Sequence, residues 1–156
     1  MTSPLLAASL DPSLKAVNQG LELFLALLEE EAIALASGNS DRLGELTHDR
    51  HSASQHLAEH WRRLAELLGL PTDAGLPALR IRAFADMTPS AAWQRLEKLT
   101  HEAARLNRVN GRLIEEQMRR TQAAMQVLQG ASSRSLYGAN GRLSDILNVN
   151  RSIDSA

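Results

Sequence analysis

The sequence predicts an all-α protein, an elongated antiparallel helical hairpin or bundle with one very long C-terminal helix and an extended or short-helical tail. Three observations support this fold class. Leucine-rich stripes recur at three- and four-residue steps in three separate stretches. Aromatic residues make up only 3% of the 156 residues, so the core consists of Leu and Ala, which are strong helix formers. The third of these stretches contains no proline, which predicts one uninterrupted helix.

The first helix is expected over residues 11–37. Asp11 and Pro12 are typical of a helix start, because Asp accepts hydrogen bonds from free amides and Pro suits the first helical position. Gly38 is expected to end the helix as a C-terminal cap. The apolar stripe is wide enough to contact two neighbouring helices. Its members are Leu14, Val17, Leu21, Leu23, Phe24, Leu25, Leu27 and Leu28.

The second helix is expected over residues 40–69, with Asn39 or Ser40 as its N-cap. The connection between the first two helices is too short for anything but an antiparallel return, which predicts a hairpin. A loop rich in helix breakers follows, and a short helix is expected over about residues 77–85. The apolar stripe of the second helix comprises Leu43, Leu46, Ala53, Leu57, Trp61, Leu64 and Leu68.

A long helix is expected over residues 89–129, with Thr88 as its cap and Pro89 at its first position. At 1.5 Å per residue, its ~40 residues would extend ~60 Å, which predicts an elongated molecule. Gly130 is expected to end it. Residues 1–130 would then form the bundle, and 131–156 a flexible tail. The apolar stripe of the long helix comprises Ala92, Leu96, Leu99, Ala103, Leu106, Asn110 and Leu113.

Composition excludes several classes of protein. The absence of cysteine rules out disulfides and thiolate metal sites, so the cytoplasm is the default location. Neither a secretory signal nor an apolar run of membrane-spanning length is present, so membrane insertion is not expected. The net charge is −1, and the arginines near the end of the long helix alternate with glutamates, so nucleic-acid binding is not expected either.

The stretch His56–His60 matches the His-x-x-Glu-His pattern of inverted zinc metalloproteases. On a helix, His56 and His60 could share a metal while Glu59 acts as the base. Such an enzyme also needs a third ligand and a closed pocket, which a thin helical bundle does not supply, so a solvated helix face is the favoured interpretation. The chain carries no phosphate loop or nucleophile motif. We therefore expect no enzyme activity, no metal and no cofactor.

Consecutive carboxylates at Glu29, Glu30 and Glu31 could be read as a cation site. Side chains at consecutive helical positions do not face one another, so a solvated helix end is the favoured interpretation.

The stretch Leu106–Ile114 contains two asparagines three residues apart, Asn107 and Asn110, beside Gly111, which costs roughly 1 kcal/mol against alanine in a helix interior. One interpretation is structural, since a polar residue at a core position fixes helix register. The other is partner binding. Tyr137, in a glycine-flanked segment, has the same two interpretations: a residue folded back on the bundle, or an amphipathic anchor at an interface.

The Asn107–Gly111 stretch, followed after the long helix by Tyr137-Gly138 and Gly141, resembles the FlgN family of flagellar export chaperones. The resemblance is densest between Arg105 and Gly141. It implies a cytosolic helical chaperone that binds hook–filament junction proteins and delivers them to the export gate and ATPase components. Its cargo would be the helical terminal segment of a junction protein.

Carried over by position, the resemblance implies a partner-binding set from the long helix and the tail. Within this set a tyrosine would dock to the export gate, and apolar tail residues would contact cargo. The set comprises Asn107, Asn110, Gly111, Tyr137, Gly138, Gly141, Leu143, Ile146 and Leu147. Homo-oligomers are possible. The alternative function is a coiled-coil structural or scaffold protein that self-associates through the same apolar stripes.

Overall fold

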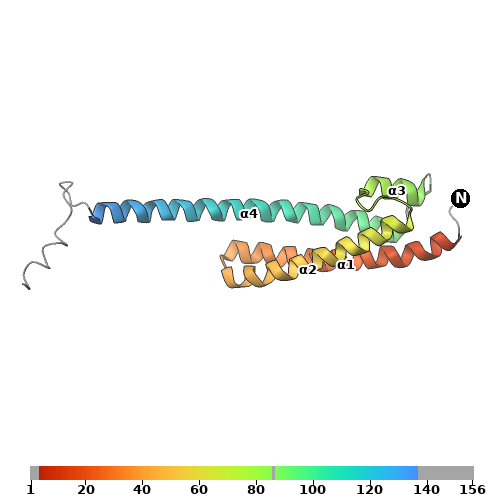
Figure 1. Cartoon of the computed structure of the whole chain (residues 1–156), viewed down its shortest axis with the longest axis horizontal. Helices are drawn as coiled ribbons and strands as arrows, with labels where there is room; N and C mark the ends of the chain where they lie inside the picture. The colour runs from red at the N-terminus through yellow and green to blue at the C-terminus, as the bar shows by residue number, and fades with distance from the viewer. Residues whose placement is uncertain (1–3, 86, 137–156) are drawn as a thin grey trace, which may run out of the picture. The chain divides into compact units, whose positions relative to one another are not determined.

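The structure is a computed structural model that describes residues 4–85 and 87–136. These residues form four α-helices and no strand: α1 (Pro4–Ser37), α2 (Ser40–Leu67), α3 (Leu76–Phe84) and α4 (Ala91–Leu136) (Figure 1). The all-α prediction and the very long C-terminal helix are confirmed. The chain divides into two compact units, residues 1–114 and residues 115–156, with the boundary inside α4.

Helix α1 begins earlier than the sequence suggested. It starts at Pro4, so Pro12 lies inside the helix and the predicted start at residue 11 is wrong. A proline in a helix interior costs about 3 kcal/mol. The added turns place Leu10 on the buried face, one turn before Leu14, and burying a leucine returns roughly 1.5–3 kcal/mol. Burial of the hydrophobic stripe thus offsets the free-energy cost of the proline inside the helix.

The turn between α1 and α2 agrees with the prediction. Gly38 has a φ of +67°, and the amide of Asn39 donates to the carbonyl of Ala34 at 3.0 Å, which satisfies a free carbonyl at the end of α1. The Oδ1 atom of Asn39 then accepts from the amide of Arg42 at 3.0 Å and so caps α2. Two helices joined in this way run antiparallel side by side, as Figure 1 shows, and the predicted hairpin is confirmed.

Side chains tie the connection around α3 to the hairpin. Trp61 on α2 donates its indole N–H to the carbonyl of Ala74 at 3.1 Å, and Arg82 on α3 donates to the carbonyl of Leu68 at 2.9 Å. Phe84 at the end of α3 packs edge-on against Trp93 of α4, with ring centroids 5.3 Å apart. The short helix therefore closes one end of the hydrophobic core.

Both predicted ends of the long helix are wrong. Helix α4 starts at Ala91, because Ser90 caps it instead of Thr88: the hydroxyl of Ser90 accepts from the amide of Trp93 at 3.3 Å. At the other end, Gly130 lies inside the helix, which continues to Leu136. A glycine in a helix interior costs about 1 kcal/mol relative to alanine. This cost is too small to end the helix, because the residues on both sides of Gly130 remain helical.

The core of the first unit lies between α1, α2, α3 and the part of α4 before residue 115. Helix α1 contacts two neighbours as predicted, since the Asn18 amide donates to the carbonyl of Ala92 on α4 at 2.9 Å, while the opposite edge of α1 packs on α2. The wide stripe is only partly buried, because Leu23 is 67% exposed. The buried members that form one continuous cluster include Leu14, Val17, Leu21, Leu28, Leu64, Leu79, Trp93, Leu96 and Leu106.

Candidate functional site

Asn110 lies inside the bundle at one of the core positions of α4. Only 1% of the residue is exposed. Its Nδ2 atom donates two hydrogen bonds to α1, one to the carbonyl of Leu28 at 2.9 Å and one to Oε2 of Glu31 at 2.7 Å. A buried amide with these bonds fixes the register of α4 on α1. The structural interpretation of Asn110 is therefore the one that its position favours.

Glu31 is the centre of this polar cluster. The same Oε2 atom accepts from Nη1 of Arg50 on α2 at 2.9 Å, so one carboxylate links α1, α2 and α4. Glu31 is 6% exposed, so its predicted place on a solvated helix end is wrong. It lies three residues after Leu28, on the buried stripe, and a carboxylate there needs hydrogen-bond partners to offset desolvation. That spacing was the missed signal in the sequence.

Two other residues of the predicted partner-binding set do not join this cluster. Asn107 and Gly111 are exposed on α4, and a Cβ atom added at Gly111 would meet no described atom within 4 Å. The structure thus separates the three residues of the Asn107–Gly111 stretch, with one inside the bundle and two at the surface. The remaining members lie outside the described residues: Tyr137, Gly138, Gly141, Leu143, Ile146 and Leu147.

The second unit begins with a helical segment that we name the α4 extension, residues 115–136. Its side chains are described as far as Ala131, and three large apolar ones are well exposed: Met118 (58%), Met125 (53%) and Leu128 (67%). They lie seven and three residues apart, so they share one face of the helix. Val127 is also exposed, but it points to the opposite side.

This apolar face is suited to binding another helix. Methionine is unbranched and adaptable, and it is common on surfaces that accept varied apolar partners. Charged side chains lie on the other side of the helix, where Arg120 binds Glu116 one turn earlier. The sequence contained a signal for this surface, since Met118 and Met125 lie off the stripe that Leu106 and Asn110 define, but the predicted apolar contacts were confined to the tail.

The His56–His60 stretch does not have the geometry of a hydrolase. Glu59, the would-be base, accepts from Arg62 at 2.7 Å and from Arg63 at 2.9 Å. These hydrogen bonds lower the pKa of Glu59 from 4.5 to about 2, whereas a general base works best with a pKa near the working pH. In the described part of the chain, no group of three or more His, Asp or Glu side chains is placed to hold a metal ion.

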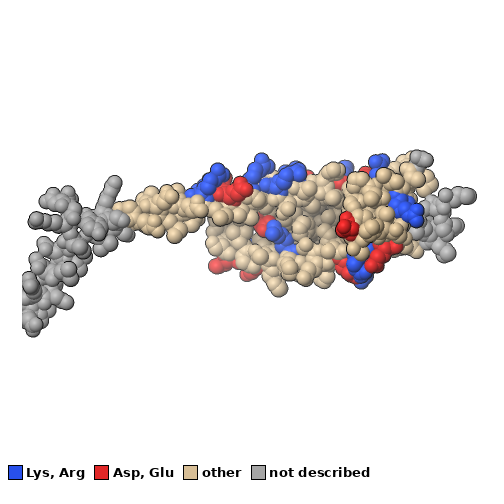
Figure 2. All heavy atoms as spheres, turned by 45° about the horizontal axis from the view of Figure 1, so that its top comes forward, with Lys and Arg blue, Asp and Glu red and all other residues tan. Residues whose placement is uncertain are grey.

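The face of the molecule drawn in Figure 2 shows no bias toward one charge. On the face drawn in Figure 2, positive and negative side chains lie interspersed, which differs from the basic stripe of a nucleic-acid-binding protein. None of the described helices combines the length and the apolar character needed to cross a bilayer.

The chain is similar to known proteins of one family. The family model described as FlgN protein matches residues 1–145. The flagella synthesis protein FlgN of Salmonella typhimurium is 27% identical over 118 residues, covering 74% of this chain and 75% of that protein. The flagella synthesis protein FlgN of Escherichia coli is 38% identical over 55 residues, 35% of this chain and 40% of that protein. No solved structure matches the chain.

Proposed function

Because this chain belongs to the FlgN family, we propose that it is a cytosolic type III export chaperone that binds hook–filament junction proteins through its C-terminal region. It would prevent their premature association and deliver them to the flagellar export apparatus. The observation that carries the proposal is the exposed apolar face of the α4 extension, formed by Met118, Met125 and Leu128. An apolar helix face that is open to water is typical of a surface that pairs with a partner helix.

The size of this face limits what it can do alone. Burying one Met or Leu side chain contributes roughly 1.5–3 kcal/mol, so three of them contribute about 4.5–9 kcal/mol. Association itself costs about 4–15 kcal/mol in lost translational and rotational freedom. The α4 extension is therefore a weak binder by itself, and stable capture of cargo needs further apolar contacts. The tail residues Leu143, Ile146 and Leu147 would supply them.

The two roles in the C-terminal region are separate. Apolar residues of the α4 extension and tail bind the helical terminal segment of the cargo, while Tyr137 serves the export gate. Asn107 and Gly111 are exposed and thus open to a partner, whereas Asn110 acts by holding α4 on α1. Cargo release then follows from competition at the gate.

Co-purification with junction proteins from a flagellated host tests the cargo surface. Met118→Asp combined with Leu128→Asp should greatly reduce the captured amount while leaving the bundle intact, because both side chains are exposed. Val127→Asp is the matched control, since Val127 is equally exposed on the opposite side of the same helix. Ile146→Asp with Leu147→Asp should also reduce capture. If both double variants captured as much junction protein as the wild type and Val127→Asp, the proposal would be contradicted.

A separate variant tests the gate. Tyr137→Ala should capture cargo normally and impair its export, measured as junction protein in the culture medium. If Tyr137→Ala exported normally, the assignment of Tyr137 to the gate would be wrong, although the cargo surface would be unaffected.

A further inference from the structure

A groove runs along the outer face of the α1–α2 hairpin, and we name it the hairpin groove. Its volume is about 590 Å³. Small side chains form much of its lining, so a partner could approach the hairpin backbone closely. Gly20 is part of this wall because α1 and α2 are close there: a Cβ atom at Gly20 would lie 3.3 Å from Cδ1 of Leu57. The small residues of the lining are Ala16, Gly20, Ala26, Ser52 and Ala53.

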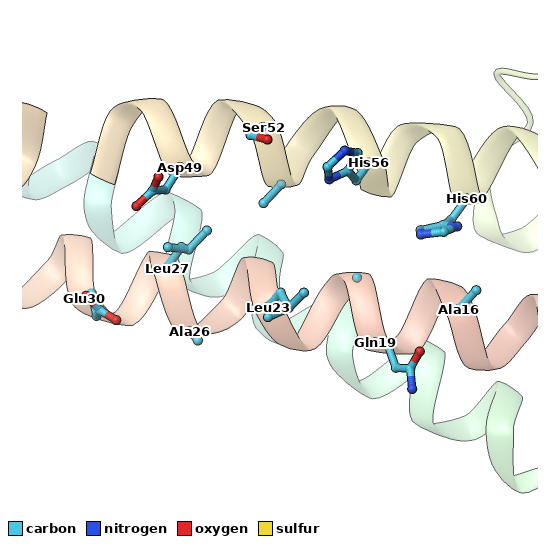
Figure 3. A pocket seen from close by; sticks show the side chains of 12 residues that line it. Ala16, Gln19, Leu23, Ala26, Leu27, Glu30, Asp49, Ser52, His56 and His60 are labelled. Atoms are coloured by element: carbon cyan, nitrogen blue, oxygen red, sulfur yellow. The ribbon is translucent and has the colours of Figure 1, made fainter. Parts of the chain in front are cut away.

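A large apolar side chain stands near the middle of the hairpin groove. Leu23 is 67% exposed, although it belongs to a helix whose neighbouring leucines are buried. Figure 3 shows Leu23 between the two ends of the groove. Such a side chain in an apolar groove is suited to a contact at the centre of an interface.

The two ends of the hairpin groove differ in chemistry. Carboxylates of Glu30 and Asp49 lie at one end, and imidazoles of His56 and His60 lie toward the other, as Figure 3 shows. Arg42 already binds Glu30. Asp49 forms no ion pair within the described part of the chain, so its carboxylate is open to a new partner.

This pattern is self-complementary under a two-fold rotation. If two hairpin grooves face each other antiparallel, the acidic end of each groove lies against the imidazole end of the other. The dimer then contains two identical contacts between an acidic end and an imidazole end. An imidazole N–H donates to a carboxylate whether or not the ring is charged, so the pairing gives hydrogen bonds at both ends. A parallel arrangement would instead place carboxylate against carboxylate, which is unfavourable.

We propose that the hairpin groove is an isologous interface in which a second copy of this chain docks antiparallel on the α1–α2 hairpin. Leu23 packs near the two-fold axis against Leu23 of the partner subunit, and Asp49 accepts hydrogen bonds from the imidazole end of the partner. The interface lies in the first unit and does not use the α4 extension, so it is independent of the cargo surface proposed above.

Sedimentation equilibrium of the full chain tests this interface. The wild type should show a concentration-dependent monomer–dimer equilibrium. Leu23→Asp should remain a monomer, whereas Ile33→Asp should dimerise like the wild type, because Ile33 is as exposed on the same helix but does not line the groove. Circular dichroism should show both variants folded. A wild type that stays monomeric up to its solubility limit, or a Leu23→Asp variant that dimerises normally, would overturn the proposal.

A charge exchange tests the antiparallel geometry. Asp49→Arg places two cationic ends against imidazoles, and His56→Asp places carboxylates against Asp49, so each variant alone should dimerise at least tenfold more weakly than the wild type. Mixing the two variants should restore association as a heterodimer, since Arg and Asp then face each other at one end and the native pair remains at the other. A mixture that associates no better than the separate variants would overturn the antiparallel arrangement.

The same variants keep this inference distinct from the chaperone proposal. Leu23→Asp should still capture junction proteins, because the α4 extension is unchanged. Loss of dimerisation with retained capture supports both proposals. Loss of capture in Leu23→Asp, with the fold intact, would overturn the independence of the two surfaces.

Discussion

The side-chain amide of Asn110 lies 2.7 Å from the carboxylate of Glu31, although 79 residues separate them in the chain. The contact joins the first and last long helices of the bundle in its interior, and Arg50 adds the second helix to the same carboxylate. An apolar stripe alone allows neighbouring helices to slide by a turn at low cost. A buried polar contact with one geometry removes that freedom.

The first prediction concerns Asn110. Replacing it with alanine removes both hydrogen bonds to α1 and leaves the buried Glu31 with Arg50 as its remaining side-chain partner. We expect Asn110→Ala to lower the free energy of unfolding by about 1–3 kcal/mol, because it removes a hydrogen bond to a charged carboxylate and a second one to a backbone carbonyl. Urea denaturation followed by circular dichroism measures this change.

The control for this substitution is Asn107→Ala. Asn107 lies on the same helix but is exposed, so its replacement should change the free energy of unfolding by less than about 0.5 kcal/mol. Equal effects of the two substitutions would show that the buried contact does not stabilise the bundle.

The second prediction concerns the coupling between Asn110 and Glu31. If the two side chains act as one unit, the effects of Asn110→Ala and Glu31→Ala will not add, and the interaction energy from a double-mutant cycle should reach about 0.5–3 kcal/mol. Strictly additive effects would indicate that Glu31 is stabilised by Arg50 alone.

Much of the fold follows from local patterns in the sequence. Gly38 and Asn39 mark the turn of the hairpin because their chemistry satisfies helix ends without help from distant residues. Helix α3 is found within one residue of the expected range, since Pro77 suits its first turn. Where a helix boundary depends on its own residues alone, the sequence is sufficient.

The errors at Pro12 and Glu31 arise because tertiary contacts outweigh local preference. Pro12 predicts a helix start, but burial of Leu10 extends α1 past it. Glu31 looks solvated in a run of carboxylates, and only its partners on two other helices explain its burial. The site residues depend even more on context, because the sequence shows that Asn107 and Asn110 are unusual but not which of the two is inside the bundle.

The third prediction concerns Trp93, the largest fully buried side chain in the described part of the chain. Its indole N–H donates to Glu97 at 2.8 Å, and its ring packs against Phe84. Trp93→Ala should destabilise the bundle by about 3–5 kcal/mol because it leaves a large cavity. Trp61→Ala, at a half-buried position, should cost less, and equal melting temperatures for the two variants would contradict this ranking.

The fourth prediction concerns pH. Contacts with Arg62 and Arg63 lower the pKa of Glu59 in the folded protein to about 2, below its ordinary value of 4.5. A depressed pKa stabilises the folded state above the unfolded value, and this stabilisation is lost as the pH falls. The melting temperature of the wild type should therefore exceed that of Glu59→Gln above pH 4.5, and the difference should shrink between pH 4.5 and 2. A difference that is constant with pH would show that these contacts are not electrostatic.

The last prediction separates stability from function at Gly111. This glycine lies within α4 at an exposed position, and a Cβ atom there meets no described atom within 4 Å. Gly111→Ala should therefore raise the free energy of unfolding by roughly 0.5–1 kcal/mol, through helix propensity alone. Gly44→Ala is the matched control, because Gly44 is equally open on α2 and belongs to no proposed binding surface.

The comparison of these two variants decides the role of Gly111. If a partner approaches the backbone of α4 there, Gly111→Ala will be more stable than the wild type and yet capture less junction protein, while Gly44→Ala gains stability and captures normally. A methyl group that is harmless to the free protein can only affect capture by blocking a partner. Normal capture by Gly111→Ala would remove this glycine from the binding surface and leave the apolar face of the α4 extension as the described part of it.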